Sequence, residues 1–370
     1  METNKKFKKI ILTGGGTGGS VTPLLAVAEE LLSGRSAFKW QLIFVGTHRG
    51  PEREMVAEFN QEIGSMPFFP LVGGKLRRYF SVHNFFDFFK ILVSGFISWR
   101  LLSTEKPDIV VSAGSFVSVP LVWAAAWKRI PVLIHQQDVR PGLANRLMAP
   151  FARLVTVTFK KSVNDFKNAA WIGNPVRDWM ISNEELTSVK EKFRVSGAHP
   201  LILVVGGGTG AAELNRLVYD AVPSLSGVCQ IIHVVGKGKL PDKISNQADY
   251  QVHEFIANRH ILALMQVSDL VVSRCGLAFL TELSFLSKAA ILVPMPASHQ
   301  EDNAAIFQEA GAAVVLREQK TSADELATEI RRLIGDQERR TEMSRKMGAV
   351  IERGAAVKMR EAIEDIILSI

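Results

Sequence analysis

A strand-like run followed by a glycine turn and an apolar helix-like run occurs twice in this chain, and this repeat limits the folds open to it. The first copy reads KKIILTGGGTGGSVTPLLAV, and the second reads HPLILVVGGGTGAAELNRLV, with Gly206 standing where Gly14 stands in the first. Glycine allows the sharp backbone turn that joins a strand to a helix. The repeat therefore predicts two domains of related architecture.

Strand-like and helix-like runs alternate through both halves of the chain. Buried β-branched strands separated by helices are typical of parallel sheets covered on both faces. We therefore expect an α/β fold with two Rossmann-like, doubly wound domains, at residues 1–173 and 174–350. The GNP sequence at 173–175 is the expected hinge, and a helix at about residues 351–370 is expected to pack back on the first domain. The predicted strands are 8–13, 40–46, 108–114, 131–136, 154–159, 201–208, 230–236, 250–255, 270–276 and 289–296.

Composition and charge exclude several classes of protein. The two cysteines, Cys229 and Cys275, provide neither a disulfide framework nor the spacing of a metal site, which fits a reduced setting. No run is apolar for the ~18 residues that a membrane span needs, and we see no signal peptide. Residues 1–177 carry 23 Lys and Arg against 12 Asp and Glu. Because no nucleic-acid-binding motif accompanies this basic half, the charge favours a phospholipid partner over nucleic acid.

The first glycine turn raises the question of a dinucleotide cofactor, because Gly14, Gly16 and Gly19 fit the pattern G-x-G-x-x-G. Such a site also needs an acidic residue at the tip of the next strand, about 20 residues later, to hold the ribose. The two corresponding strands run into Thr47 and Lys237 instead. This argues against nicotinamide or flavin binding. The loops either present backbone N–H groups to another anion or serve as tight turns alone.

Six ordered blocks identify a family resemblance that covers nearly the whole chain. They are GGGTGGSVTPLLAVAEEL, the segment from VVSAGSFVSVP to ANRLMAPFA, GNPVR, VVGGGTGA, SRCGLAFLTEL and PMPASHQEDNAAIFQEAGAA. Their order and spacing resemble the MurG family. The resemblance implies a GT-B fold, in which two Rossmann-like domains face each other across a cleft. It also implies an inverting transfer of GlcNAc from UDP-GlcNAc to the MurNAc 4-hydroxyl of lipid I, an undecaprenyl-diphosphate-linked MurNAc-pentapeptide, which yields lipid II for peptidoglycan.

The resemblance implies no required cofactor or metal, and it places the donor site in the second domain. Arg177 would bind phosphate or uracil, Glu282 the ribose, and Ile256 the uracil ring. The alternatives are a surface salt bridge for Arg177, a solvated helix charge for Glu282 and a core position for Ile256. The donor diphosphate would lie on Gly207, Gly208, Thr209 and Gly210, and the sugar hydroxyls on His299 and Gln300, whose alternative is a capped loop.

The acceptor half departs from the family pattern. Ser20 replaces the usual histidine of the glycine loop, and the usual His-Glu-Gln-Asn reads His135-Gln136-Gln137-Asp138. An inverting transfer needs a base near the attacking hydroxyl, and serine alone is a poor base. We therefore expect Asp138 to be the base with help from His135; the alternatives are a turn-capping Asp138 and a core His135. The expected catalytic set is Asp138, His135 and Ser20, and the expected acceptor contacts are Thr17, Gly18, Gly19, Ser20, Phe116, Gln136 and Asn145.

Residues 75–101 combine basic residues with a phenylalanine-rich run, which suits an interfacial helix on anionic lipid. The alternative is an amphipathic helix packed on its own domain. We expect a peripheral protein at the cytoplasmic face of the bacterial plasma membrane. The changed acceptor residues also leave open a GT-B transferase that uses another lipid-linked acceptor, or a non-catalytic UDP-sugar-binding protein. The predicted membrane patch is Lys75, Arg77, Arg78, Phe85, Phe89, Trp99, Trp123 and Trp127.

Overall fold

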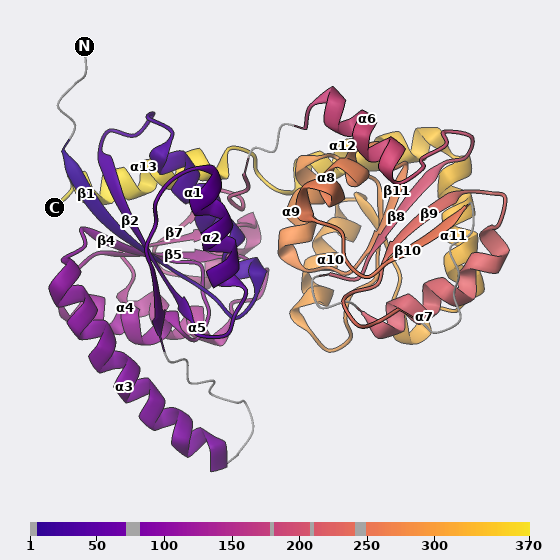
Figure 1. Ribbon diagram of the computed structural model, residues 1–370. Coiled ribbons are helices and arrows are strands. Elements are labelled where there is room, and N and C mark those ends of the chain that lie inside the picture. Colours follow the sequence, from indigo (N-terminus) through magenta and orange to yellow (C-terminus); the bar gives the residue numbers. More distant parts are fainter. Residues whose placement is uncertain (1–5, 72–81, 178–180, 208–210, 241–248) are drawn as a thin grey trace. The chain divides into compact units, whose positions relative to one another are not determined.

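The computed structural model describes residues 6–71, 82–177, 181–207, 211–240 and 249–370, with the backbone alone at 82–91 (Figure 1). The chain forms two compact units. The first contains residues 1–178 and 352–370, and the second contains residues 179–351. The first unit therefore ends five residues later than the expected 173, and it includes the C-terminal helix.

The first unit is built on a seven-stranded parallel sheet with the order β3-β2-β1-β4-β5-β6-β7. Its strands are β1 (Phe7–Thr13), β2 (Lys39–Thr47), β3 (Phe68–Leu71), β4 (Ile109–Ser112), β5 (Val132–Gln136), β6 (Leu154–Val157) and β7 (Ala169–Trp171). Its helices are α1 (Thr22–Leu32), α2 (Glu52–Glu62), α3 (Val82–Glu105), α4 (Ser118–Trp127), α5 (Leu143–Met148) and α13 (Ala355–Leu368). Short 3-10 helices lie at Gly18–Ser20, Ala149–Phe151 and Lys160–Asp165.

The second unit is built on a six-stranded parallel sheet with the order β10-β9-β8-β11-β12-β13. Its strands are β8 (Leu201–Val205), β9 (Gln230–Val234), β10 (Tyr250–His253), β11 (Leu270–Ser273), β12 (Ala290–Leu292) and β13 (Ala313–Val315). Its helices are α6 (Asn183–Lys192), α7 (Ala212–Ala221), α8 (Asn258–Val267), α9 (Leu277–Phe285), α10 (His299–Glu309), α11 (Ala323–Gly335) and α12 (Gln337–Val350), with 3-10 helices at Val222–Leu225 and Glu318–Lys320.

Both faces of the first sheet are covered, as strand β1 shows. Successive side chains of a strand point to opposite faces. Ile10 and Leu12 pack in one core cluster with residues of α1, α2 and α13, whereas Ile11 packs in another with residues of α4 and α5. The apolar run IIL is buried on both sides for this reason, and the expected α/β class with two Rossmann-like parallel-sheet units is confirmed.

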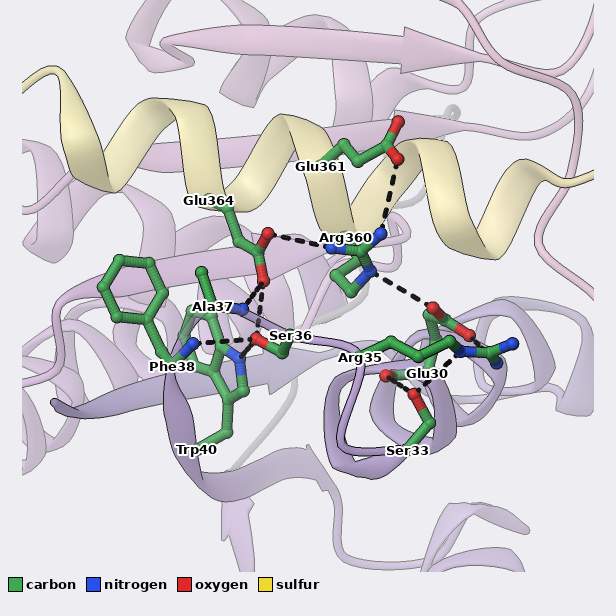
Figure 2. A network of polar contacts seen from close by, with 10 residues as sticks. All are labelled: Glu30, Ser33, Arg35, Ser36, Ala37, Phe38, Trp40, Arg360, Glu361 and Glu364. Carbon is green, nitrogen blue, oxygen red and sulfur yellow. Dashed lines mark hydrogen bonds and ion pairs between the residues drawn. The ribbon is translucent and has the colours of Figure 1, made fainter. Parts of the chain in front are cut away.

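The last helix, α13, packs on α1 through apolar side chains. Figure 2 shows the polar contacts that join them. The Arg360 guanidinium lies 3.1 Å from Glu30 and 2.9 Å from Glu364. The Glu364 carboxylate also accepts from the Ser36 hydroxyl at 2.5 Å and from the Ala37 N–H at 2.9 Å. Since these charges are almost fully buried, each needs its partners to offset the loss of water. The chain therefore returns to the first unit after completing the second.

Candidate functional site

The loop between β1 and α1 is closed by its own hydrogen bonds. Gly16 has a φ of +80°, which glycine adopts without strain. The Ser20 hydroxyl accepts from the Gly15 N–H at 3.0 Å and donates to the Gly15 carbonyl at 3.1 Å. Its one proton is thus used inside the loop, which favours a loop-closing role, and the catalytic role of Ser20 stays a prediction. Thr17 is exposed, with Gly18 and Gly19 half-buried beside it, and their contact with an acceptor stays a prediction.

A buried carboxylate that the sequence analysis missed lies under the same loop. Glu52 is fully buried, and its two oxygens accept from the Gly16 N–H at 3.2 Å and the Thr47 N–H at 2.5 Å. The tip of β2 therefore does carry an acid, supplied by the first turn of α2, but the loop itself uses it. The signal available in the sequence was a glutamate at the start of a helix, five residues after Thr47.

His135, at the end of β5, is a core histidine. Its Nδ1 lies 3.0 Å from the Thr156 hydroxyl and its Nε2 lies 2.9 Å from the Asn174 side-chain oxygen. Burial lowers the pKa of His135 to about 4, so the ring is neutral at pH 7. Both ring nitrogens are engaged away from solvent, which favours the core alternative, and the assistance of His135 in proton transfer stays a prediction.

Gln136 shapes the loop that carries Asp138. Its amide nitrogen donates to the carbonyls of Asp138 at 2.7 Å and Arg140 at 3.3 Å, and its oxygen accepts from Asn145 at 2.7 Å. A glutamate could not donate these two bonds. Gln136 is almost fully buried in these contacts, and its direct contact with the acceptor stays a prediction. Asp138 itself is half-buried two residues past β5, and its role as base stays a prediction.

Asn145 is the acceptor-side candidate with unused hydrogen-bonding capacity. Its amide nitrogen donates to Gln136 and to the His135 carbonyl, which fixes the direction of the side-chain oxygen. Among the described residues that buried oxygen has no partner, and a β-carbon at Gly114 would lie 3.1 Å from it. A ligand N–H or O–H would satisfy it. Phe116 is half-buried against the neighbouring core cluster, and both acceptor contacts stay predictions.

Ser115 holds a left-handed backbone conformation with φ of +78°. Four of the other positive-φ, non-glycine residues follow helix ends, but Ser115 follows strand β4 at the predicted acceptor site. Since that conformation costs a non-glycine residue about 1 kcal/mol, we expect Ser115→Gly to raise the thermal midpoint by about 2–4 °C in a calorimetric scan. Ser226→Gly, at φ of −57°, is the matched control and should lower it. A lower midpoint for Ser115→Gly would contradict the strain.

An aromatic patch lies on the outer faces of α3 and α4, which pack together; we define it as Leu92, Val93, Phe96, Trp99, Trp123 and Trp127. Trp127 is 85% exposed and Phe96 is 64% exposed. The Lys128 ammonium lies 4.7 Å from the Trp99 ring centre, so a cation borders the patch. Lys75, Arg77 and Arg78 lie outside the described residues, as do the side chains of Phe85 and Phe89. No helix within the described ranges is both long and apolar enough to cross a bilayer.

The loops at the carboxyl ends of β11 and β12 are tied together by Gln300. Its side-chain oxygen accepts from the N–H groups of Cys275 and Met295, each at 3.1 Å. Within the described ranges the Gln300 amide N–H groups donate no hydrogen bond, and His299 is exposed at the start of α10. Gly207 is exposed with φ of +87°, and Gly208, Thr209 and Gly210 lie outside the described residues. Sugar and diphosphate binding here stay predictions.

Glu282 is a buried carboxylate on α9. Burial raises its pKa to about 7, and a hydrogen bond with Asn258 opposes that shift in part. The solvated-helix alternative for Glu282 is therefore wrong. Ile256 is also buried, two residues before Asn258, so both its core alternative and a backbone contact with a ligand remain compatible with its position. The described residues contain no group of three His, Cys, Asp or Glu side chains that could hold a metal ion.

Arg177 belongs to the first unit and is engaged there. Its Nε lies 2.7 Å from Glu29 on α1, and its Nη2 lies 2.9 Å from Glu62 on α2. Two carboxylates thus hold the guanidinium, whose side chain is mostly buried. These two ion pairs favour the salt-bridge alternative, and the donor-site role of Arg177 stays a prediction.

Comparisons with known proteins agree across both units. Residues 10–157 match the glycosyltransferase family 28 N-terminal domain, and residues 201–366 match the glycosyltransferase family 28 C-terminal domain. The UDP-N-acetylglucosamine--N-acetylmuramyl-(pentapeptide) pyrophosphoryl-undecaprenol N-acetylglucosamine transferase of Clostridium botulinum is 37% identical over 320 residues, which are 85% of this chain and 87% of the relative. The Clostridium kluyveri protein of the same name is 34% identical over 364 residues, which are 97% and 99% of the two chains.

Solved structures of glycosyltransferases also resemble this chain over nearly its whole length. The crystal structure of Acinetobacter baumannii MurG is 25% identical, with a TM-score of 0.73 over 97% of this chain and 99% of that one. A structure of S. aureus MnaA with UDP reaches a TM-score of 0.72 over 98% of each chain at 14% identity, which is a likeness of fold alone. With its GT-B fold and its two matching domains, this chain belongs to the MurG family of glycosyltransferases.

Proposed function

We propose that this protein is an inverting glycosyltransferase that moves GlcNAc from UDP-GlcNAc to the MurNAc 4-hydroxyl of lipid I, making lipid II. The observation that carries the proposal is the 34% identity, over 97% of the chain, to a relative named for this transfer. The donor site is assigned to the second unit: the loop at 206–210 for the diphosphate, Glu282 for the ribose, and Gln300 with His299 for the sugar.

The first unit is proposed to bind the acceptor and the membrane. Asn145 offers an unsatisfied buried oxygen to the acceptor, and Asp138 is the proposed base that takes the proton of the attacking hydroxyl. The aromatic patch and its bordering lysine support docking on an anionic membrane surface, the cytoplasmic face of the plasma membrane, where a polyprenyl-linked acceptor resides.

A radiochemical assay tests this function: purified protein, UDP-GlcNAc and lipid I should release UDP and yield lipid II.

A second candidate, transfer to another lipid-linked acceptor, is favoured by the replacement of three usual acceptor-side residues by Ser20, Gln136 and Asp138. Turnover with other polyprenyl-diphosphate sugars but none with lipid I would support that candidate. Tight UDP binding without turnover on any acceptor would indicate a non-catalytic UDP-sugar-binding protein.

Donor binding is expected to weaken below pH 7, because a Glu282 carboxylate must be ionised to accept two ribose hydroxyls. Its pKa of about 7 means that binding at pH 6 must first remove a proton, so Kd should rise about tenfold between pH 8 and pH 6. The pyrophosphate of UDP-GlcNAc stays fully ionised over this range. Calorimetric titration measures the Kd, and Glu282→Gln should bind weakly with no such pH dependence. A constant wild-type Kd would refute this role of Glu282.

A further inference from the structure

The glycine loop of the first unit encloses a negative charge supplied by the protein itself. Glu52, the first residue of α2, has no solvent exposure. One carboxylate oxygen accepts from the Gly16 N–H, and the other accepts from both the N–H and the hydroxyl of Thr47, each at 2.5 Å. The carboxylate thus joins the loop after β1 to the tip of β2.

Three glycines make room for this side chain. A β-carbon at Gly46 would lie 2.6 Å from the Glu52 Cγ, and β-carbons at Gly15 or Gly50 would overlap its carboxylate. These glycines come from the loop after β1, the end of β2 and the turn before α2. Alanine at any of them would force Glu52 out, so the surrounding backbone fits this one carboxylate.

A carboxylate can accept hydrogen bonds on both of its oxygens, which a glutamine side chain cannot do. Removing a carboxylate from water is costly, and its hydrogen bonds must offset that cost. Two backbone N–H groups approach different oxygens of Glu52, so a glutamine could accept from only one of them. The NH₂ group of the glutamine would face the other backbone N–H, and two donors cannot form a hydrogen bond with each other.

We propose that Glu52 is a positioning residue of the acceptor site, which fixes the glycine loop in the shape that binds the lipid-linked acceptor. Ser20 holds Gly15 and Glu52 holds Gly16, so the base of the loop is fixed by two side chains. Since Glu52 occupies the Gly16 N–H, an acceptor diphosphate is bound by the outer part of the loop. This inference rests on the proposed function for the identity of the acceptor, but not for the role of Glu52 in holding the loop.

The test compares Glu52→Gln with Glu54→Gln, an exposed glutamate in the same first turn of α2. We expect Glu52→Gln to lower kcat/KM for lipid I at least tenfold, while KM for UDP-GlcNAc stays within twofold of the wild type. Glu54→Gln should match the wild type in both. Unchanged kinetics for Glu52→Gln, or an equal loss in donor and acceptor parameters, would overturn the proposal.

Amide hydrogen exchange without substrate separates this inference from the proposed function. Gly16 and Thr47 should exchange at least tenfold faster in Glu52→Gln than in Glu54→Gln, whatever the wild type transfers. If Glu52→Gln does not fold, Thr47→Val provides a second test, because it removes just the hydroxyl bond to Glu52. It should change kcat/KM for lipid I and the exchange at Gly16 in the same directions, but by several-fold rather than tenfold. Lack of wild-type turnover with lipid I would count against the function, whereas unaltered exchange at Gly16 would count against Glu52.

Discussion

Asp138→Asn is expected to lower kcat by ~10²–10⁴-fold, because an amide cannot take the proton of the attacking hydroxyl. Gln136 holds the backbone of this loop through the Asp138 carbonyl, which the substitution retains. The binding of both substrates should therefore change little. Steady-state kinetics with lipid I, together with a UDP-GlcNAc titration, separates the two effects.

Asp165→Asn is the matched control, since Asp165 is an exposed aspartate of the same unit, at the end of a 3-10 helix. It should retain wild-type turnover. Full turnover in Asp138→Asn, with normal binding of both substrates, would show that Asp138 is not the base and would support the turn-capping alternative.

The double variant Phe96→Ser/Trp127→Ser is expected to bind anionic vesicles ~30–700-fold more weakly. Both rings are largely exposed, and burial of each in the interface contributes about 1–2 kcal/mol. Co-sedimentation with phosphatidylglycerol vesicles measures the loss. Wild-type binding should also weaken as salt rises, because salt screens the attraction between Lys128 and the lipid headgroups.

Trp171→Ser is the control for this pair, since Trp171 is a partly exposed tryptophan on β7, outside the aromatic patch. It should leave vesicle binding unchanged. Equal vesicle binding by the double variant and the wild type would show that the patch does not dock on lipid.

Most of the fold could be predicted from the sequence, because parallel strands buried on both faces leave continuous apolar runs that can be recognised locally. Runs such as 8–13 and 201–208 correspond to β1 and β8. The strands β3, β7 and β13 were missed; each has four residues or fewer and lies at a sheet edge. Such short segments are strands because they pair with a neighbouring strand of the sheet, and their own sequence pattern does not indicate this.

The site was harder to predict, because side-chain roles depend on contacts between residues far apart in the chain. Arg177 meets Glu29 and Glu62, and no local pattern indicates either ion pair. His135 contacts Thr156 and Asn174, which come from β6 and the segment after β7, and no local pattern indicates either contact. A motif fixes which residues are present near a site, but their partners decide which of them remain available to a ligand.

The return of α13 to the first unit affects the order in which the protein is completed during synthesis. The first unit needs Met359 and Ile363 in its core, yet these residues leave the ribosome after the whole of the second unit. Until then the apolar side of α1 lacks its cover. The second unit is a continuous stretch of chain and has all of its core residues earlier. In the nascent chain, therefore, the half that is made first is the half that finishes folding last.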